Sequence, residues 1–492
     1  MRWPDETKEK TMAAAVTTPA GIHSLLETQQ QAFNRAGAVS AETRKTRIQQ
    51  VIDLLVDNCD ALADAMGADF GEGQNGGRPR AFSIMNDILG SLGSLKHARD
   101  NLDTWLETDS RTPFAPYDQM GGEAEVMHQP KGSVGIIGTW NAPLFTLFSP
   151  LACALAAGNR AILKPSEVVP QTAALVAELI STHLDPEVIA VATGDAEIGA
   201  AFAGSPFNHL VFTGSTAVGR KIMRAAAENL VPVTLELGGK SPVILGRSAD
   251  VDDACRRLAI AKGTNGGQIC ISPDVLYVPA EKLEASIAAL KTHFCALYPT
   301  VDDNPDLVAA VNDSHLQRVE AYLADAEDRG VRIESSHPDA ASSTRKRPLR
   351  LAINPPADSQ IMQEEIFGSA LVIKTYNELD EVFDDIHSRG RPLALYYFGQ
   401  DKDEEQQVLT QTLSGGVTVN DLLMHAAMHE APFGGVGASG MGHYHGYEGF
   451  LEFSHARTLF RAPAYDPRAE WGMLPPHHDQ FETMMRAQVT KD

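Results

Sequence analysis

Cysteine is scarce in this sequence, and its spacing fits neither a disulfide framework nor a structural zinc site. The chain has 492 residues and five cysteines, no two of which form a CxxC pair. Disulfide-rich domains and structural zinc sites both need closely spaced cysteines. We therefore expect free thiols in a reducing compartment and predict a cytoplasmic protein. The cysteines are Cys59, Cys153, Cys255, Cys270 and Cys295.

Positive charge is also in short supply. Lysine and arginine together number 41 against 64 aspartate and glutamate residues, which gives a formal net charge of −23. Nucleic acids and anionic membrane surfaces attract basic proteins, so this balance argues against both as partners. It says little about a small-molecule substrate, because one local pocket can oppose the overall sign.

No stretch has the composition of a membrane span or a signal peptide. Residues 132–159 carry no charge, but Asn141, Pro143 and Pro150 interrupt them, and a continuous spanning helix tolerates such residues poorly. The first residues, MRWPDETKEKTMAAAV, mix acids with lysines and lack an apolar core. We expect no membrane segment, and read 132–159 as buried core with a functional loop inside it.

An alternation of short apolar runs with helical segments defines the fold class. At about 150 residues per domain, the length allows roughly three domain-sized units. Strand centres near Ile136, Ile162, Val191, Val211 and Leu235 lie 20–29 residues apart, with helical segments between them. This spacing is typical of βα units, which build a parallel sheet flanked by helices. The runs are continuously apolar, as expected for strands buried on both faces.

A second alternation predicts a second α/β domain. Its strands are expected at 242–244, 275–278, 371–376, 393–398 and 416–419, and its helices at 251–264 and 281–297. Before the first alternation, residues 21–106 have helical spacing. Residues 335–346 are polar and predict a surface loop. Residues 432–446 contain six glycines, which favours a folded loop because glycine disfavours both helix and strand.

One glutamate and one cysteine stand in surroundings that favour chemistry. Glu236 lies in LELGGKSP and Cys270 in GGQICISPD. A thiol is a strong nucleophile only as thiolate, and its free pKa is about 8.5, so a nearby carboxylate helps by taking a proton from the thiol or from water. Taken alone, a cysteine beside glycines is more often a small buried residue.

Seven motifs in order extend this pair into a family pattern. They are GTWNAPLF (138–145), AAGNRAILKPSE (156–167), FTGSTAVG (212–219), LELGGKSP (235–242), GQICISPD (267–274), EEIFG (364–368) and PFGGVGASGMG (432–442). Over roughly residues 20–460 they resemble the aldehyde dehydrogenase superfamily. VTLELGGKSP, SGMGHYHG and FSH resemble its class 3 branch, and MGHYHGYEGF is most similar to the bacterial coniferyl aldehyde dehydrogenases.

The resemblance implies a two-domain aldehyde dehydrogenase-like α/β fold with Rossmann-type parallel sheets. It also implies a small β extension that pairs subunits into a homodimer. The implied division is a loose arm at 1–20, an NAD(P)-binding domain at 21–116 and 132–236, oligomerisation strands at 117–131 and 445–462, a catalytic domain at 237–444 and a C-terminal extension at 463–492.

The resemblance also assigns catalytic roles. Cys270 matches the family's nucleophile, which attacks the aldehyde carbon. Asn141 matches the amide that stabilises the resulting oxyanion together with the backbone N–H of Cys270. Glu236 matches the base that activates water to hydrolyse the thioester. Without the family, Asn141 would read as a turn residue before Pro143.

The cofactor implied by the resemblance is NAD, with NADP also allowed. Lys164 and Glu167 match the positions that hold the adenosine ribose, and Glu167 should repel a 2′-phosphate. Gly214 and Ser215 open a helix suited to the pyrophosphate. The other implied cofactor-binding residues are Trp140, Ser166, Glu365 and Phe367. Outside the family context, Glu365 would read as an ordinary loop acid and Phe367 as a core aromatic.

Two positions depart from the family pattern, and one histidine group invites a metal. Ser369 follows EEIFG where the family usually has proline. Tyr444 stands where many members carry a glutamate proposed in proton removal, which puts that proton route in doubt.

The histidines between 425 and 445 lack an HExxH arrangement, so we predict channel-lining or structural roles and no metal. These histidines are His425, His429, His443 and His445.

The predicted substrate is an apolar or aromatic aldehyde. The helix after Asn141 carries Leu144, Phe145, Leu147 and Phe148, and no cation occurs between Lys131 and Arg160. A carboxylate-bearing semialdehyde would need such a cation. Long-chain aliphatic aldehydes remain an alternative. The remaining alternatives for the function are a non-redox thiol esterase, a non-catalytic homologue and a CoA-dependent acylating variant.

Overall fold

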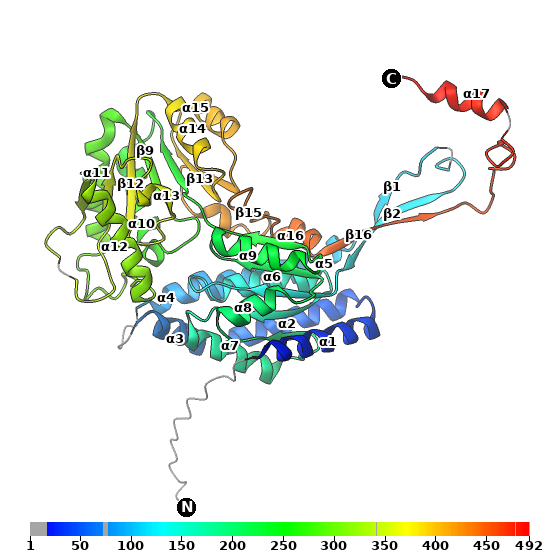
Figure 1. The fold of residues 1–492 in the computed structure, drawn as a ribbon, viewed down its shortest axis with the longest axis horizontal. Coiled ribbons are helices and arrows are strands. Elements are labelled where there is room, and N and C mark those ends of the chain that lie inside the picture. The colour runs from blue at the N-terminus through cyan, green and yellow to red at the C-terminus, as the bar shows by residue number, and fades with distance from the viewer. Residues whose placement is uncertain (1–16, 72–76, 116, 341, 478, 492) are drawn as a thin grey trace, which may run out of the picture. The chain divides into compact units, whose positions relative to one another are not determined.

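The computed structural model describes residues 17–71, 77–115, 117–340, 342–477 and 479–491. The chain divides into two compact units, one formed by Met1–Trp105 with Pro130–Ser454 and the other by Leu106–Gln129 with His455–Asp492. Figure 1 colours the chain from the N-terminal helices to the C-terminal helix α17. No helix among the described residues is both long and apolar enough to cross a membrane.

The first unit contains the predicted parallel sheet. Its strand order is β15-β7-β6-β3-β4-β5, with β15 antiparallel and the rest parallel. The strands are β3 (Ser133–Ile137), β4 (Arg160–Lys164), β5 (Ile189–Val191), β6 (His209–Thr213), β7 (Val233–Glu236) and β15 (Gly440–Met441). Every residue of β3, β4 and β6 is buried, as the continuous apolar runs predicted. The connecting helices are α6 (Phe145–Ala156), α7 (Pro170–His183), α8 (Ala196–Ala203) and α9 (Thr216–Ala227).

The N-terminal segment is helical, as its spacing predicted. Its elements are α1 (Pro19–Ala36), α2 (Ala41–Asp57), α3 (Cys59–Phe70), α4 (Arg80–Ser83), the π-helix η1 (Ile84–Leu89) and α5 (Gly90–Trp105). Ile22 and Leu26 of α1 pack with Ile162 of the sheet in one hydrophobic cluster. The buried Gln29 side chain donates to the Ala161 carbonyl at 2.8 Å, which fixes α1 against β4. The segment therefore buries an apolar stripe on the first sheet.

A second sheet in the same unit has the order β10-β11-β12-β9-β8-β13-β14, in which β10 is antiparallel. Its strands are β8 (Pro242–Leu245), β9 (Val275–Pro279), β10 (Arg332–Ser335), β11 (Arg350–Ile353), β12 (Ala370–Tyr376), β13 (Ala394–Phe398) and β14 (Gly416–Val419). The helices are α10 (Val251–Gly263), α11 (Leu283–Leu297), α12 (Asp313–Asp328), α13 (Gln360–Gln363), α14 (Leu379–Ser388) and α15 (Lys402–Gln411), with short 3-10 turns η2 (Thr264–Gly267), η3 (Ala280–Lys282) and η4 (Met424–Ala427). All strands predicted here are present, each within about two residues of its expected ends.

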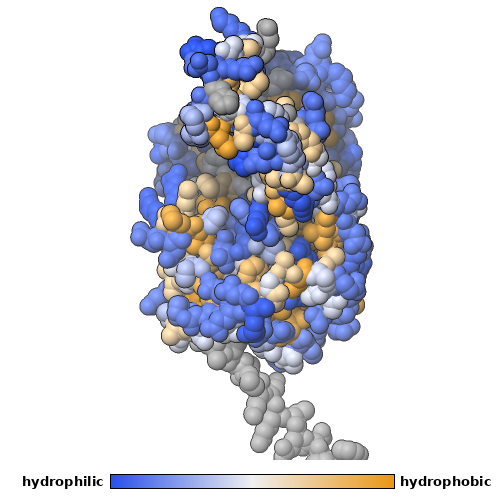
Figure 2. Space-filling view, turned by 90° about the vertical axis from the view of Figure 1, so that its right-hand side faces the viewer, coloured by the Kyte–Doolittle hydropathy of each residue, from blue (hydrophilic) through white to orange (hydrophobic). Residues whose placement is uncertain are grey.

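The second unit is a three-stranded sheet of order β1-β2-β16 followed by α17. Its bounds are β1 (Asp109–Arg111), β2 (Glu123–Pro130), β16 (Ser454–Arg461) and α17 (Asp479–Gln488). The expected strand at 445–462 is wrong in its first half, where α16 (Gly446–Glu452) stands in the first unit. Gly449 lets this helix approach α6, because a Cβ there would lie 2.7 Å from Cys153 Sγ. Hydrophilic residues dominate the face in Figure 2, as the charge leads one to expect.

Candidate active site

Cys270 follows a tight turn at the end of α10 that only small residues can form. Asn265, Gly266 and Gly267 have φ of 49°, 61° and 74°. A Cβ on Gly267 would lie 2.4 Å from the Gly368 carbonyl oxygen, so this position requires glycine. The turn delivers Cys270 half-buried in front of β9.

The Asn141 side chain is fixed beside this turn. Its Nδ2 donates to the Gln268 carbonyl at 3.0 Å, and its Oδ1 accepts from the Thr139 hydroxyl at 2.5 Å. Asn265 Nδ2 donates to the backbone carbonyls of both Asn141 and Gln268, at 3.2 and 3.1 Å. These bonds use one amide N–H of Asn141 and leave the second for another acceptor.

A buried ion pair that the sequence reasoning missed supports the Asn141 loop. Arg78 and Asp87 pair with both side chains fully buried. Arg78 donates to the Asn141 carbonyl at 3.2 Å, and Asp87 Oδ1 accepts from the backbone N–H groups of Leu144 and Phe145 at 3.1 and 3.4 Å. The two residues are far from Asn141 in sequence and belong to no motif, so no local signal marks them.

Glu236 ends β7 with only 2 % of its surface exposed, and its Oε1 has no hydrogen-bond partner. Burial raises its pKa well above the usual value. The pKa of Cys270 is likewise raised well above its usual value, first by burial and then by the negative charges of Glu236 and Glu365. Burial therefore favours the neutral form of both groups, and Glu236 lies close enough for its charge, when ionised, to act on the thiol.

Tyr444, where many relatives carry glutamate, is buried in the same region. Its backbone forms a bridge with Phe433, with N–O distances of 2.8 and 3.0 Å. Burial raises its pKa, and the charges of Glu236 and Cys270 add to this effect. A phenol held in its neutral form therefore occupies the place of an ionisable carboxylate.

The residues expected to hold a cofactor gather at the carboxyl edge of the first sheet. Lys164 ends β4, and its Nζ donates to Glu167 Oε2 at 3.0 Å. The Ser166 hydroxyl accepts from the Val168 N–H at 3.3 Å. After β6, Gly214 precedes Ser215, whose side chain caps α9 by accepting from the Val218 N–H. In open parallel sheets, this edge binds ligands.

The segment carrying Glu365 and Phe367 is held by three charged side chains. Asp274 Oδ2 accepts from the Ile366 N–H at 2.8 Å. Arg318 donates to the carbonyls of Glu365 and Phe367 at 3.1 and 3.2 Å. Lys240, of LELGGKSP, pairs with Asp274 and donates to the Glu364 carbonyl at 2.9 Å. None of these three was predicted as a site residue.

The Glu365 carboxyl lies against the bare backbone of LELGGKSP. A Cβ on Gly238 would lie 2.1 Å from its Oε2, and burial raises the pKa of Glu365 to about 8. The Phe367 ring lies 5.3 Å from that of Trp140, whose other neighbour is His315 at 4.6 Å. The expected cofactor-binding residues Trp140 and Phe367, from two separate segments, are thus brought into contact.

These residues fit a dinucleotide. The first turn of α9 carries no acid, so no negative side chain there opposes an anion at the positive end of the helix. Neither Gly214 nor Gly238 has a side chain to block close approach. Lys164 and the half-exposed Glu167 offer a donor and an acceptor for a diol.

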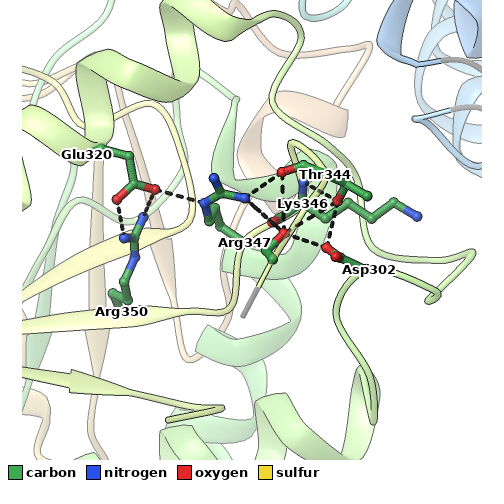
Figure 3. A network of polar contacts seen from close by, with 7 residues as sticks. Asp302, Glu320, Thr344, Lys346, Arg347 and Arg350 are labelled. Carbon is green, nitrogen blue, oxygen red and sulfur yellow. Dashed lines mark hydrogen bonds and ion pairs between the residues drawn. The ribbon is translucent and has the colours of Figure 1, made fainter. Parts of the chain in front are cut away.

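A polar network runs from Asp302 through Thr344 and Arg347 to Glu320 and Arg350 (Figure 3). Asp302 accepts from the Ser343 N–H at 2.7 Å and the Thr344 hydroxyl at 2.7 Å. In the same loop, Arg345 donates to the Ala310 carbonyl at 2.9 Å. The segment around Ala310 in turn binds the Gln268 side chain, which accepts from Val311 N–H at 3.0 Å.

The departure at Ser369 and the histidine group have structural explanations. The Ser369 hydroxyl donates to the Gly266 carbonyl at 3.4 Å, a bond that proline could not make. Within the described ranges, no three histidine, cysteine, aspartate or glutamate side chains are grouped to hold a metal ion. His425 and His429 instead make hydrogen bonds to Thr418 and Ser94.

Comparison with known proteins agrees with the motifs found in the sequence. Residues 3–459 match the aldehyde dehydrogenase family. The chain belongs to this family, a class of oxidoreductases that act on aldehydes.

Individual relatives show a more specific similarity than the family match does. The chain is 44% identical over 477 residues to a probable coniferyl aldehyde dehydrogenase of Caulobacter vibrioides, covering 96% of this chain and 97% of that protein. It is 46% identical over 442 residues to the coniferyl aldehyde dehydrogenase of Pseudomonas sp. strain HR199, covering 89% and 90%. Among solved structures, the substrate-bound AldH of Staphylococcus aureus has a TM-score of 0.87 at 33% identity, covering 95% and 99%. The Mycobacterium tuberculosis aldehyde dehydrogenase complexed with NAD+ has a TM-score of 0.81 at 26% identity, covering 94% and 97%.

Proposed function

We propose that this protein oxidises an apolar aromatic aldehyde of the coniferyl aldehyde type to its carboxylic acid with NAD, through Cys270. The convergence of Cys270, Asn141 and Glu236 carries this proposal. It is supported by relatives named coniferyl aldehyde dehydrogenases that match nearly the whole chain. NADP stays a second cofactor candidate.

The first chemical step is attack by sulfur on the aldehyde carbon. The S–C bond forms while the carbonyl π electrons move to oxygen, giving a thiohemiacetal. The free N–H of Asn141 and the backbone N–H of Cys270 are the donors for that oxygen. The attack also removes the thiol proton, and its acceptor is the Glu236 carboxylate, whose charge reaches the thiol.

The cofactor is held by this chain's own polar groups. Lys164, Ser166 and Glu167 would bind the adenosine ribose, and Glu167 would repel a 2′-phosphate. Gly214, Ser215 and the start of α9 would receive the pyrophosphate. At the other end, Glu365, Phe367 and Trp140 would hold the nicotinamide ribose and ring. A bound nicotinamide supplies a hydride acceptor, and loss of hydride converts the thiohemiacetal to a thioester.

Hydrolysis completes the cycle. Glu236 first releases the thiol proton to solvent. It then takes a proton from water, the water oxygen bonds to the thioester carbon, and the C–S bond breaks to return the cysteine as thiolate. The carboxylic acid leaves. An unpartnered Oε1 on Glu236 is consistent with a place kept for that water.

Only some of the apolar residues expected near the aldehyde are partly exposed. Leu144, Leu147 and Phe148 are fully buried, so they belong to the core, whereas Phe145 is half-buried. Ile269, beside the nucleophile, is half-buried too. Phe145 and Ile269 are therefore the apolar side chains we assign to the aldehyde.

We also propose the larger organisation. The first sheet with the N-terminal helices forms the NAD(P)-binding domain, and the second sheet forms the catalytic domain. The second unit carries the oligomerisation strands of a homodimer. The scattered free thiols favour the cytoplasm.

Nucleotide reduction, followed by absorbance, tests the proposal. Purified protein with NAD or NADP would be assayed on coniferaldehyde, benzaldehyde, hexanal and succinic semialdehyde. We expect strong turnover of the aromatic aldehydes, none in Cys270→Ala, and full turnover in the matched control Cys59→Ala. Turnover confined to hexanal or to the semialdehyde would contradict the substrate class. Ester hydrolysis without nucleotide reduction would favour the thiol esterase.

A further inference from the structure

A basic segment interrupts this acidic chain before β11. Residues 344–350 have the sequence TRKRPLR, and no acidic residue occurs between Asp339 and Asp358. The segment leads into β11, which pairs antiparallel with the edge strand β10 and places Ser335 opposite Arg350. Positive charge gathered in a chain of net charge −23 gives a local field that attracts anions.

An open cavity of about 280 Å³ lies at this end of the β10–β11 hairpin. Pockets for drug-sized ligands span about 300–1,000 Å³, so this cavity suits a smaller guest. The side chains of Arg347 and Arg350 are 22 % and 16 % exposed, so an anion in solution can reach both. The polar side chains that line the cavity are Glu320, Ser335, His337, Ser342, Arg347 and Arg350.

Two guanidinium groups at the cavity share one carboxylate (Figure 3). Glu320 Oε1 accepts from Arg347 Nε and Arg350 Nη2, both at 2.9 Å, and Oε2 accepts from Arg350 Nη1. Burial opposes ionisation of Glu320, but the bonds and charges of the two arginines lower its pKa, so the carboxyl is negative. The neighbouring Asp302 does not line the cavity, and its charge acts on Lys346. The cavity wall therefore keeps a net positive charge.

The Arg347 guanidinium is fixed in place at the cavity. Its Nη1 donates to the Ser342 hydroxyl and to the carbonyls of Thr344 and Lys346, at 2.9, 2.6 and 2.8 Å. These bonds and the one to Glu320 use Nε and Nη1, and they leave Nη2 for a further acceptor. A side chain that is already fixed loses little freedom when it binds an anion.

Other polar groups at the cavity also have bonding capacity to spare. The Ser335 hydroxyl oxygen accepts from the His337 N–H at 3.2 Å, so its own proton stays available to an acceptor. Arg350 Nε and His337 Nε2 are buried without a hydrogen-bond partner among the described residues. Buried polar atoms are normally satisfied, so these two point to a polar guest.

We propose that this cavity binds the phosphate group of a small anion, either inorganic phosphate or a small phosphate monoester. The phosphate oxygens accept from Arg347 Nη2, from the Arg350 guanidinium and from the Ser335 hydroxyl. Arginine matches the geometry of phosphate, whose oxygens point in more directions than the two of a single carboxylate. The site is separate from the catalytic residues, and the inference does not depend on which aldehyde the enzyme oxidises.

Isothermal titration calorimetry of the full chain saturated with NAD tests this inference, because NAD then occupies the proposed pyrophosphate site. With inorganic phosphate or glycerol 3-phosphate in low-salt buffer we expect one site with a Kd of about 1 mM or below. Tighter binding of glycerol 3-phosphate would identify a monoester as the guest, and tighter binding of inorganic phosphate would identify the free ion. Succinate bound as tightly as either would overturn the assignment to phosphate.

Matched variants locate the binding. Ala340 is exposed and lines the cavity, so Ala340→Glu adds a negative charge there while keeping every arginine bond. We expect it to weaken phosphate binding at least about tenfold, and the neutral control Ala340→Gln to stay within about threefold. This pair tests the site even if an arginine variant does not fold.

An arginine pair provides the second comparison. Arg347→Gln should weaken phosphate binding about tenfold or more, the size of one charge-assisted hydrogen bond. Arg332→Gln removes a cation of β10 that does not line the cavity and should keep the wild-type affinity. No binding to wild type, or wild-type affinity in both Ala340→Glu and Arg347→Gln, would overturn the inference and leave the proposed aldehyde oxidation standing.

Discussion

Burial raises the pKa of both Glu236 and Cys270, whereas the proposed chemistry needs their deprotonated forms. A base with a raised pKa gains its active form as pH rises. We therefore expect kcat to increase as pH rises. In Glu236→Gln we expect one equivalent of reduced nucleotide in a rapid burst, followed by a steady state about 10²–10⁴ slower. Stopped-flow absorbance measures both phases, and a steady state at the wild-type rate would refute the role of Glu236.

Thermal unfolding provides the control for that variant. A carboxyl whose pKa is raised in the folded state stabilises the fold less as pH rises from its unfolded value, near 4.5, through its folded value. Glu236→Gln removes the ionisable carboxyl, and with it this loss of stability at high pH. We therefore expect the variant to be at least as stable as wild type at pH 8, so that its slow turnover cannot be ascribed to unfolding.

Tyr396 is a positioning residue for the nucleophile's loop. Tyr396→Phe leaves the Ile271 carbonyl without its donor, and an unsatisfied buried group costs about 1–3 kcal/mol. We expect a lower free energy of unfolding and an altered rate of Cys270 alkylation by iodoacetamide. Tyr397→Phe is the matched control, since the Tyr397 hydroxyl contacts the Asp401 carbonyl at 3.4 Å and Ser248, not the nucleophile's loop. Equal effects in the two variants would contradict a specific role for Tyr396.

Residues inside motifs were predictable from sequence, and their supports were not. Cys270, Glu236 and Asn141 could be proposed because they stand in motifs that resemble those of a known family. Arg78 and Arg318 reach the site only through tertiary folding, and their bonds go to backbone carbonyls, which any sequence provides. Periodicity and spacing carry no information about such contacts.

At the scale of elements, the start of α6 depends on one buried carboxylate. Asp87 accepts from the first N–H groups of that helix and neutralises Arg78. Asp87→Ala leaves a buried unpaired guanidinium, which costs about 3–5 kcal/mol. We expect that loss in urea unfolding, together with weaker oxidation through displacement of Asn141. Asp100→Ala, which breaks an exposed pair with Arg99, should cost about 0–1 kcal/mol. Similar losses in the two variants would contradict a special role for Asp87.

Most strands of the two parallel sheets were predicted, although β10 and β11 were not. The centres of β3 and β4 are apolar, and the second-sheet strands β9 and β12 also formed readable runs. Helices α12 and α15 were missed because they are polar: α15 buries only Val408. The second half of the expected strand at 445–462 became β16, while Phe450 and Phe453 in the first half are buried by α16 and the turn after it. Tertiary packing decided between strand and helix in this segment, and local sequence patterns carry no information about it.

At the scale of the whole molecule, the second unit lacks a core of its own. None of its described residues belongs to the buried hydrophobic set. Instead, Phe114 and Phe460 are 66 % and 39 % exposed, and they cluster with Tyr117 at centroid separations of 5.0–5.9 Å. A three-stranded sheet needs a covered hydrophobic face for stability, and exposed aromatic clusters mark interaction surfaces. A second copy of the chain is the partner we propose.

Light scattering after size-exclusion chromatography tests the homodimer. We expect a mass near 106 kDa, twice the 53.0 kDa of the chain. Phe460→Glu places a charge in the aromatic cluster, and burying it in an interface would be costly, so this variant should shift toward the monomer mass as it is diluted. Tyr465→Glu, at a residue 51 % exposed in the same unit and outside the cluster, is the control and should keep the wild-type mass. A monomeric wild type, or a Phe460→Glu variant that stays dimeric on dilution, would remove the cluster as the subunit interface and leave the catalytic proposal unaffected.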